Sequence, residues 1–94
     1  MDKSRATDAA IRSACATTVV HFRKQKGLSQ EKLALEAEIP RSYMSGIERG
    51  VHTPSLETIA KLLPLFEITW VEFFREFEAA LRRAQKRNRA DTKS

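Results

Sequence analysis

The spacing of three chain-breaking residues, Gly27, Pro40 and Gly50, constrains the fold of this chain more than any other feature. Glycine readily takes the left-handed conformation that ends a helix, whereas proline disfavours helix in the residue before it and suits the first helical turn itself. Between these breaks, apolar residues recur at helical spacing. We therefore expect two short helices, about Gln30–Glu36 and Pro40–Arg49, joined by a tight turn.

The second short helix has only a narrow apolar seam. In the sequence EIPRSYMSGIERG, Met44 and Ile47 are apolar and three positions apart, and Ile39 precedes them at the turn. These residues can anchor one face of the helix, which leaves the other faces polar or small. The outward residues are Arg41, Ser42, Ser45, Gly46 and Arg49. A helix of this kind is better suited to a groove than to a protein core.

Helical patterns also flank this pair of helices. Upstream, Thr7 or Asp8 can cap a helix that ends near Gly27. Ser29 can cap the first short helix, and downstream Ser55 can cap a fourth helix. The sequence TWVE forms a capping box that begins a fifth helix, which reaches about Arg87. The apolar residues on one face of this fifth helix are Trp70, Phe73, Phe74, Phe77, Leu81 and Ala84. These patterns predict an all-α fold of five helices with an extended C-terminal helix.

Length and composition favour one compact domain. A chain of 94 residues fits a single core, and 41% hydrophobic residues are enough to build one. We expect a flexible arm at residues 1–7, one domain at 8–87 and a flexible basic tail at 88–94. The chain has no apolar run long enough for a membrane span, and its N-terminus lacks the apolar stretch of a signal peptide. We therefore expect it to stay in the cytoplasm, without a membrane partner.

Charge is unevenly distributed along the chain. The formal net charge is +5, with six Lys/Arg against two acids in residues 1–28, four against six in 29–68, and seven against four in 69–94. Positive flanks around a slightly acidic centre permit binding to a polyanion, although solubility alone explains them equally well.

Residues with catalytic or metal-binding potential do not form a recognisable site. The lone Cys15 falls on an apolar helix face and is expected to be a buried structural thiol. His21 and His52 are far apart and have no further ligand at metal-binding spacing. The sequence shows no catalytic triad, no paired catalytic carboxylates and no Gly-rich phosphate loop. We expect neither an enzyme nor a bound metal, cofactor or small-molecule ligand.

Double-stranded DNA is the partner that best fits the polar helix. The major groove, about 12 Å wide, admits one α-helix, whose N-terminal residues reach base edges first. Arg41 is then the leading base reader, because a guanidinium can donate two hydrogen bonds to guanine, whereas Ser42 specifies little. Two roles stay open. Tyr43 can contact sugar-phosphate or stack in the core, and Gly46 indicates close approach of either the DNA backbone or a packed helix.

Phosphate contacts are expected around the two short helices. The start of the first short helix, near Gln30, offers free backbone amides and the Gln30 side-chain donor, which together form an anion site. Arg49, His52 and Thr53 flank the second short helix and can contact the DNA strand on its far side. Contacts of this kind position the protein without specifying a sequence.

The segment FRKQKGLSQEKLALEAEIPRSYMSGIERGVHTPSLETIAKLL resembles the phage-repressor and Cro-like helix-turn-helix family, also called the xenobiotic-response-element type. The residues that carry the resemblance are Arg23, Gly27, Leu28, Ser29, Gln30, Leu33, Ala34, Ile39, Ile47, Glu48, Arg49, Gly50, Pro54, Ser55 and Leu56. The match covers about residues 19–74. The compact size and the sequence RSYMSGIERG are most similar to small stand-alone regulators, including controllers of restriction-modification systems.

The resemblance implies a compact, lambda-repressor-like domain of five helices that binds operator DNA as a symmetric dimer. It also implies that Gln30 contacts phosphate and that an ion pair links Arg23 to Glu48. The base-reading positions that it implies are Arg41, Ser42 and Gly46. Two residues depart from the family pattern, because Pro40 replaces the usual cap and Gly46 replaces a longer polar side chain. Base reading here therefore rests on fewer residues.

The apolar face of the fifth helix is longer than the core of a small domain. At 1.5 Å per residue, Leu81 and Ala84 lie about 16–21 Å beyond Trp70, so another surface must cover them. We favour a homodimer, because two recognition helices must lie about 34 Å apart to read successive turns of DNA. The residues assigned to this interface are Trp70, Phe73, Phe74, Phe77 and Leu81. The alternative is that the helix folds back on the first helix of its own chain.

The predicted function is sequence-specific binding of a palindromic operator by a homodimer that regulates transcription. An alternative is an antitoxin-type module that binds a partner protein as well as DNA, although no long disordered segment remains to wrap such a partner.

Overall fold

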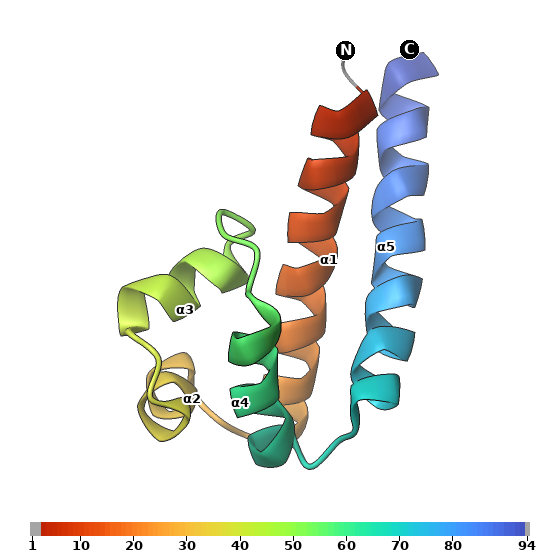
Figure 1. Cartoon of the computed structure of the whole chain (residues 1–94). Coiled ribbons are helices and arrows are strands. Elements are labelled where there is room, and N and C mark those ends of the chain that lie inside the picture. Colours follow the sequence, from red (N-terminus) through yellow and green to blue (C-terminus); the bar gives the residue numbers. More distant parts are fainter. Residues whose placement is uncertain (1–2, 94) are drawn as a thin grey trace.

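The computed structural model describes the backbone of residues 3–93 and the side chains of residues 7–87 (Figure 1). Over that range the chain forms five helices and no strand, which confirms the predicted all-α fold. The helices are α1 Lys3–Gln25, α2 Gln30–Ala37, α3 Arg41–Glu48, α4 Leu56–Phe66 and α5 Trp70–Lys93. Within this described part of the chain, no helix has the length and apolar character that crossing a membrane requires.

The outer ends of α1 and α5 differ from the prediction. α1 begins at Lys3 rather than at Thr7 or Asp8, and α5 continues to Lys93. A capping residue marks where a helix can begin, but a neighbouring helix that packs alongside can extend it past that point. The predicted arm and tail are thus mostly helical, with residues 1–2 and 94 outside the described part. The domain boundaries at 8 and 87 stay a prediction.

Side chains cap three helices where the sequence predicted. Ser29 Oγ and Ser55 Oγ each accept a hydrogen bond at 3.0 Å from a backbone amide in the first turn of α2 and α4, respectively. At the start of α5, the Thr69 amide donates to Glu72 Oε1 at 2.8 Å, and the Glu72 amide donates to Thr69 Oγ1 at 3.1 Å. The reciprocal pair is the predicted capping box.

Two glutamates, rather than glycines, end α2 and α4. Glu38 and Glu67 take the left-handed conformation with φ of 57° and 59°, which is uncommon for a residue with a Cβ. Lys26 Nζ donates a hydrogen bond to Glu67 Oε1 at 2.7 Å, and this hydrogen bond lowers the pKa of the Glu67 carboxyl. Pro40 correctly predicted that α2 ends nearby, but neither glutamate was itself predicted as a helix end.

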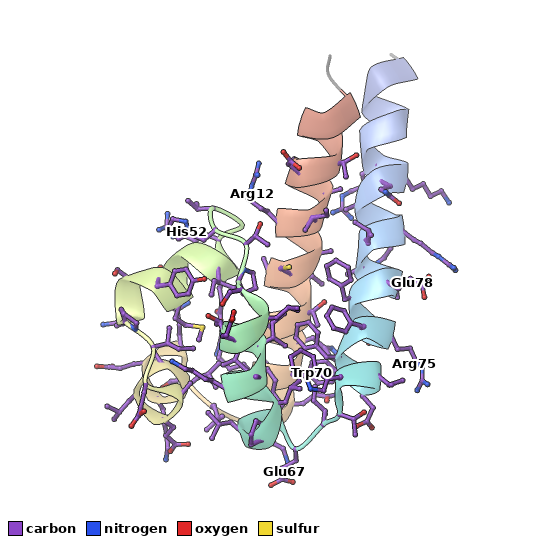
Figure 2. The ribbon with its side chains drawn as sticks, in the orientation of Figure 1. Arg12, His52, Glu67, Trp70, Arg75 and Glu78 are labelled. Atoms are coloured by element: carbon purple, nitrogen blue, oxygen red, sulfur yellow. The ribbon has the colours of Figure 1, made fainter. Side chains whose placement is uncertain are left out.

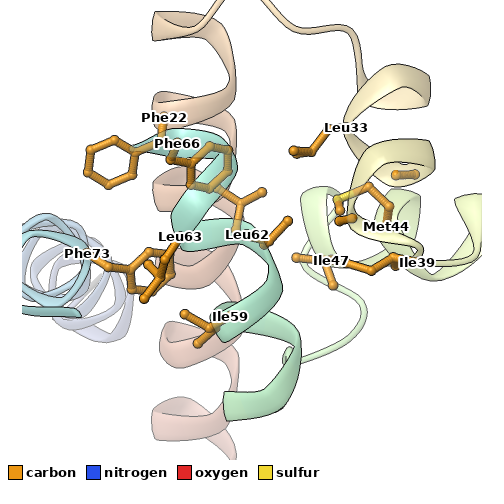
Figure 3. Close-up of a cluster of buried hydrophobic side chains, with 13 residues drawn as sticks. Phe22, Leu33, Ile39, Met44, Ile47, Ile59, Leu62, Leu63, Phe66 and Phe73 are labelled. Carbon is orange, nitrogen blue, oxygen red and sulfur yellow. The ribbon is translucent and has the colours of Figure 1, made fainter. Parts of the chain in front are cut away.

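The hydrophobic core contains side chains from all five helices. Figure 3 shows the α4 side chains between an aromatic group and the apolar residues of α2 and α3. In the aromatic group, the ring of Phe22 stacks on Phe66 at 5.8 Å and on Phe73 at 6.3 Å between centroids. Phe73 is completely buried within its own chain. Its assignment to an interface between two chains was therefore wrong, because the core of the monomer already uses it.

The long apolar face of α5 packs against α1 of the same chain. The two helices run antiparallel and lie side by side along their lengths (Figure 1). The buried residues along this pair include Ala10, Ala14, Ala80 and Ala84. Alanine side chains allow two helices to approach closely. For Ala84, the fold-back alternative is the one observed, and a second chain is not needed to cover it.

Cys15 lies in the same pair of helices and is 4% exposed, as expected for a structural thiol. Burial raises the pKa of the Cys15 thiol to about 11. The thiol therefore stays protonated near neutral pH and behaves as a small apolar side chain.

Candidate nucleic-acid interface

Helices α2 and α3 form a compact helix-turn-helix unit whose inner face joins the core. Met44 and Ile47 are fully buried, and Ile39 in the turn is 7% exposed. Figure 3 shows these three side chains close to Leu33 of α2 and directed towards α4. The predicted apolar anchor of α3 is confirmed.

The N-terminal end of α3 presents a polar surface. Arg41 and Ser42 are exposed, and none of the described residues forms a hydrogen bond or ion pair with Arg41. Pro40 occupies the cap position, and no side chain caps the helix. The first backbone amides of α3 therefore lie next to an unpaired guanidinium, and both kinds of group favour an anionic ligand.

Ser45 lies further along the same helix and contacts Arg49, the residue that follows the last residue of α3. Arg49 Nε donates to Ser45 Oγ at 3.2 Å, and Arg49 is exposed while Ser45 is half-buried. This contact holds the guanidinium along the helix surface. The structure thus leaves the Arg41 and Ser42 side chains of α3 without a hydrogen bond within the described residues, whereas Ser45 of α3 is linked to Arg49 at the C-cap.

Gly46 does not lie on the outer face, and the expectation that it does was wrong. It is buried, and the group that approaches it within the chain is not a packed helix but the imidazole of His52 from the loop after α3. Periodicity placed the position on the outer side. It gave no signal that the following loop turns back over the helix.

Of the two roles that the sequence left open for Tyr43, the structure shows packing against the core, and a contact with sugar-phosphate stays a prediction. Its ring is half-buried against the hydrophobic core, and it also contacts the His52 ring at 5.7 Å between centroids. His52 and Thr53 are both exposed. In Figure 2, His52 lies on the same side of the molecule as Arg12 of α1. A backbone contact supports this placement, because a Cβ at Gly50 would lie 3.9 Å from the Arg12 carbonyl oxygen.

Arg23 and Glu48 form a two-point ion pair between α1 and the end of α3. The distances are 2.7 Å from Arg23 Nε to Glu48 Oε2 and 3.0 Å from Arg23 Nη2 to Glu48 Oε1. The two side chains are only 14% and 5% exposed. Arg23 Nη1 also donates to the Leu28 carbonyl at 2.8 Å, so one guanidinium ties α1 to both the loop before α2 and the end of α3.

Gln30 belongs to the same network, which the sequence did not indicate. Gln30 Nε2 donates to Glu48 Oε1 at 3.0 Å. One amide hydrogen of Gln30 is therefore engaged inside the protein.

Among the described side chains, no group of three or more His, Cys, Asp or Glu residues could hold a metal ion.

An apolar patch lies away from α3, at the start of α5. Trp70, Val71 and Phe74 are 41%, 65% and 38% exposed, and the Trp70 and Phe74 rings stack at 6.2 Å. With Arg75 and Glu78 they line a shallow groove. Figure 2 shows Trp70, Arg75 and Glu78 along the first turns of α5. Of the other residues assigned to an interface, Phe77 and Leu81 are half-buried beside this patch.

Comparisons with known proteins agree with this geometry. A family model described as helix-turn-helix matches residues 21–73, more than half of the chain. The HTH-type transcriptional regulator SlrR of Bacillus subtilis (strain 168) is 44% identical over 54 residues, which are 56% of this chain and 36% of that protein. The control protein C.BamHI of Bacillus amyloliquefaciens is 47% identical over 38 residues, 40% of this chain and 47% of that protein. The chain thus spans less than half the length of these two relatives.

Solved structures share the arrangement of helices. The restriction-modification controller protein C.Esp1396I, in a tetramer bound to its 35-base-pair operator, superposes with a TM-score of 0.68 at 27% identity, over 76% of this chain and 93% of that one. The clp gene regulator ClgR of Corynebacterium glutamicum reaches 0.75 at 23% identity, over 87% and 88%, which supports the fold alone. The chain belongs to the helix-turn-helix family of DNA-binding transcriptional regulators, in its phage-repressor and Cro-like branch.

Proposed function

We propose that the chain binds a palindromic operator as a homodimer and so regulates transcription, with α3 of each copy in the major groove. The observation that carries this proposal is the division of α3 into two faces. Met44 and Ile47 are fully buried, whereas Arg41 at its start is exposed and unpaired among the described residues. A helix that is anchored on one face and polar on the other fits the width of the groove.

Sequence is read mainly by the first turn of α3. Arg41 can donate two hydrogen bonds to guanine O6 and N7, a contact that is worth about 1–3 kcal/mol of discrimination. Ser42, beside it, can contact several bases. Ser45 contributes less to specificity, because its hydroxyl already accepts a hydrogen bond from Arg49. Recognition thus depends on one strong reader in each half-site.

Phosphate binding occurs at the start of α2. One hydrogen of the Gln30 amide is bonded to Glu48, and the second hydrogen remains to donate to a phosphate oxygen. Because Glu48 is also held by Arg23, a phosphate bound there is positioned relative to both α1 and α3. Arg49 and Thr53 contact the backbone on the other side of α3.

The homodimer forms through the apolar patch of Trp70, Val71 and Phe74 rather than through the buried Phe73. Arg75 and Glu78 line the same groove. Across a two-fold axis, the arginine of one copy can face the glutamate of the other, so the patch is complementary to itself. The operator complex of C.Esp1396I contains a tetramer of that protein, so this structural relative is bound to its operator as an oligomer.

Selection of bound fragments from random DNA tests the reading of sequence. We expect the wild-type chain to enrich a palindrome at low ionic strength. Arg41→Ala should lose preference at one base pair per half-site, whereas Gln30→Ala should weaken binding to all sequences alike. Thermal unfolding of both variants checks that Gln30→Ala has not unfolded the network around Glu48. Identical selection profiles for the two variants would show that these roles are wrongly assigned.

Sedimentation velocity tests the interface. Trp70→Glu places a charge in the proposed contact and should convert the dimer to a monomer. Leu56→Glu is the matched control, because Leu56 is also an exposed apolar residue, at 62%, but lies on α4 outside the patch. A Trp70→Glu chain that sediments as the wild-type dimer would place the interface elsewhere.

A further inference from the structure

The loop after α3 folds back onto the helix and is fixed there by its own backbone. The Gly46 carbonyl accepts hydrogen bonds from the amides of Val51, at 2.8 Å, and His52, at 3.2 Å. Gly50 makes the reversal possible with φ of 75°, a left-handed conformation. His52 is therefore held over the C-terminal half of α3 by main-chain contacts, independently of its side chain.

The imidazole of His52 occupies the space that a side chain at position 46 would need. A Cβ added to Gly46 would overlap His52 Cδ2 and lie 2.8 Å from Nε2. Real Cβ atoms essentially never approach another atom this closely. Any other residue at position 46 must displace the ring, so the observed position of His52 depends on Gly46.

The aromatic ring of Tyr43 lies beside the imidazole. The two ring planes are inclined at 33°, and Tyr43 is itself packed against the core. His52 is nevertheless exposed. Its ring thus lies against Gly46 and Tyr43, and the residue as a whole remains accessible to a ligand on the α3 surface.

Building on the proposed function, we propose that His52 makes the DNA contact that position 46 lacks, and that Gly46 is the positioning residue for it. From its place over Gly46, the imidazole donates a hydrogen bond to a phosphate oxygen of the operator. A neutral or protonated imidazole always carries at least one N–H donor. Phosphate is favoured over a base edge because base edges are reached by the N-terminal residues of α3, whereas His52 follows its C-terminal end.

Operator titrations of His52→Ala, Gly46→Ala and the double variant test the proposal. His52→Ala should lower the affinity about fivefold, as for one lost hydrogen bond, with no change in base preference. Gly46→Ala should cause the same loss because it displaces the ring. The double variant should bind like His52→Ala alone. His52→Gln, which keeps a side-chain donor, should recover part of the affinity.

Thermal unfolding separates this role from a purely structural one. In the His52→Ala chain, Gly46→Ala should raise Tm by about 5 °C, because alanine favours a helix interior over glycine and the obstructing ring is gone. The same substitution therefore stabilises the fold while leaving DNA affinity unchanged in that background.

Two results would overturn the inference. If the affinity losses of Gly46→Ala and His52→Ala multiply in the double variant, the residues act independently. If His52→Ala changes base preference, His52 reads a base and the assignment to phosphate is wrong. A wild-type chain that prefers no DNA sequence is a different result, because it refutes the proposed operator binding itself, and this inference with it.

Discussion

The α2–α3 unit and the α1–α5 pair bury their helices in different ways. Along α1 and α5, alanines such as Ala14 and Ala80 allow the helices to pack closely. In the α2–α3 unit, a few large apolar residues are combined with the polar network of Arg23, Glu48 and Gln30. Both regions are buried, but among the described residues the α1–α5 pair has a single side-chain ion contact, His21 to Glu76 at 3.9 Å, whereas the α2–α3 unit is held by a two-point ion pair.

The difference shows how a small domain can keep α3 fixed while leaving Arg41 and Ser42 on its outer face exposed. Apolar contacts resist separation but constrain orientation weakly, whereas a two-point ion pair fixes both distance and angle. Arg23 and Glu48 supply that constraint at the end of α3. The apolar α1–α5 pair serves as the support against which it acts.

Truncation of the buried ring that α5 contributes to the core should have the largest effect. Phe73→Ala removes a fully buried ring and should lower the free energy of unfolding by about 3–5 kcal/mol. Phe74→Ala is the control, because the neighbouring ring is 38% exposed and should lose far less. Urea denaturation of both variants makes the comparison. Equal losses would mean that the core does not depend on Phe73 as the structure indicates.

Breaking the polar network of Arg23, Glu48 and Gln30 should cause the second-largest loss of stability. Glu48→Ala leaves the guanidinium of Arg23 buried without its partner and should cost about 3 kcal/mol of stability. Lys26→Ala, which breaks the exposed pair with Glu67, should change stability little. If chemical denaturation gives both variants the same free energy of unfolding, the ion pair of Arg23 and Glu48 does not stabilise the α2–α3 unit more than an exposed pair does.

Overpacking the α1–α5 pair should have a smaller effect. Ala84→Leu introduces a larger side chain where the helices approach closely, and it should cost about 1–3 kcal/mol. Ala79→Leu places the same side chain on the exposed face of α5 and should be close to neutral. The melting temperatures of the two variants test this prediction. An Ala84→Leu chain with an unchanged Tm would show that the helices do not pack closely at Ala84.

Loss of a single cap should have the smallest effect. Ser29→Ala removes the hydrogen bond to the first turn of α2 and should cost about 1 kcal/mol. Ser42→Ala, on the exposed first turn of α3, removes no hydrogen bond within the described residues and should leave Tm unchanged. If the Ser29→Ala chain is as stable as the Ser42→Ala chain, the Ser29 cap does not stabilise the α2–α3 unit.

Prediction from the sequence was most successful where a local pattern has one physical meaning. The caps at Ser29 and Ser55 and the anchor of Met44 and Ile47 follow from spacing along a single helix. Prediction was wrong where one side chain can meet several surfaces. Phe73 and its neighbour Phe74 are the same residue type on the same helix, and periodicity could not tell which of them the core would bury.

The sequence alone determined the five helices, most of their ends and the polar face of α3, because helix propensity, capping and apolar periodicity are properties of neighbouring residues. The tertiary structure decided which surface covers each apolar face. It placed α5 against α1, the Gln30 amide on Glu48 and the His52 ring over Gly46. Apart from Gly46 and His52, which a turn brings together, these contacts join residues that are distant along the chain, and the geometry of all three depends on how the helices and loops pack as a whole.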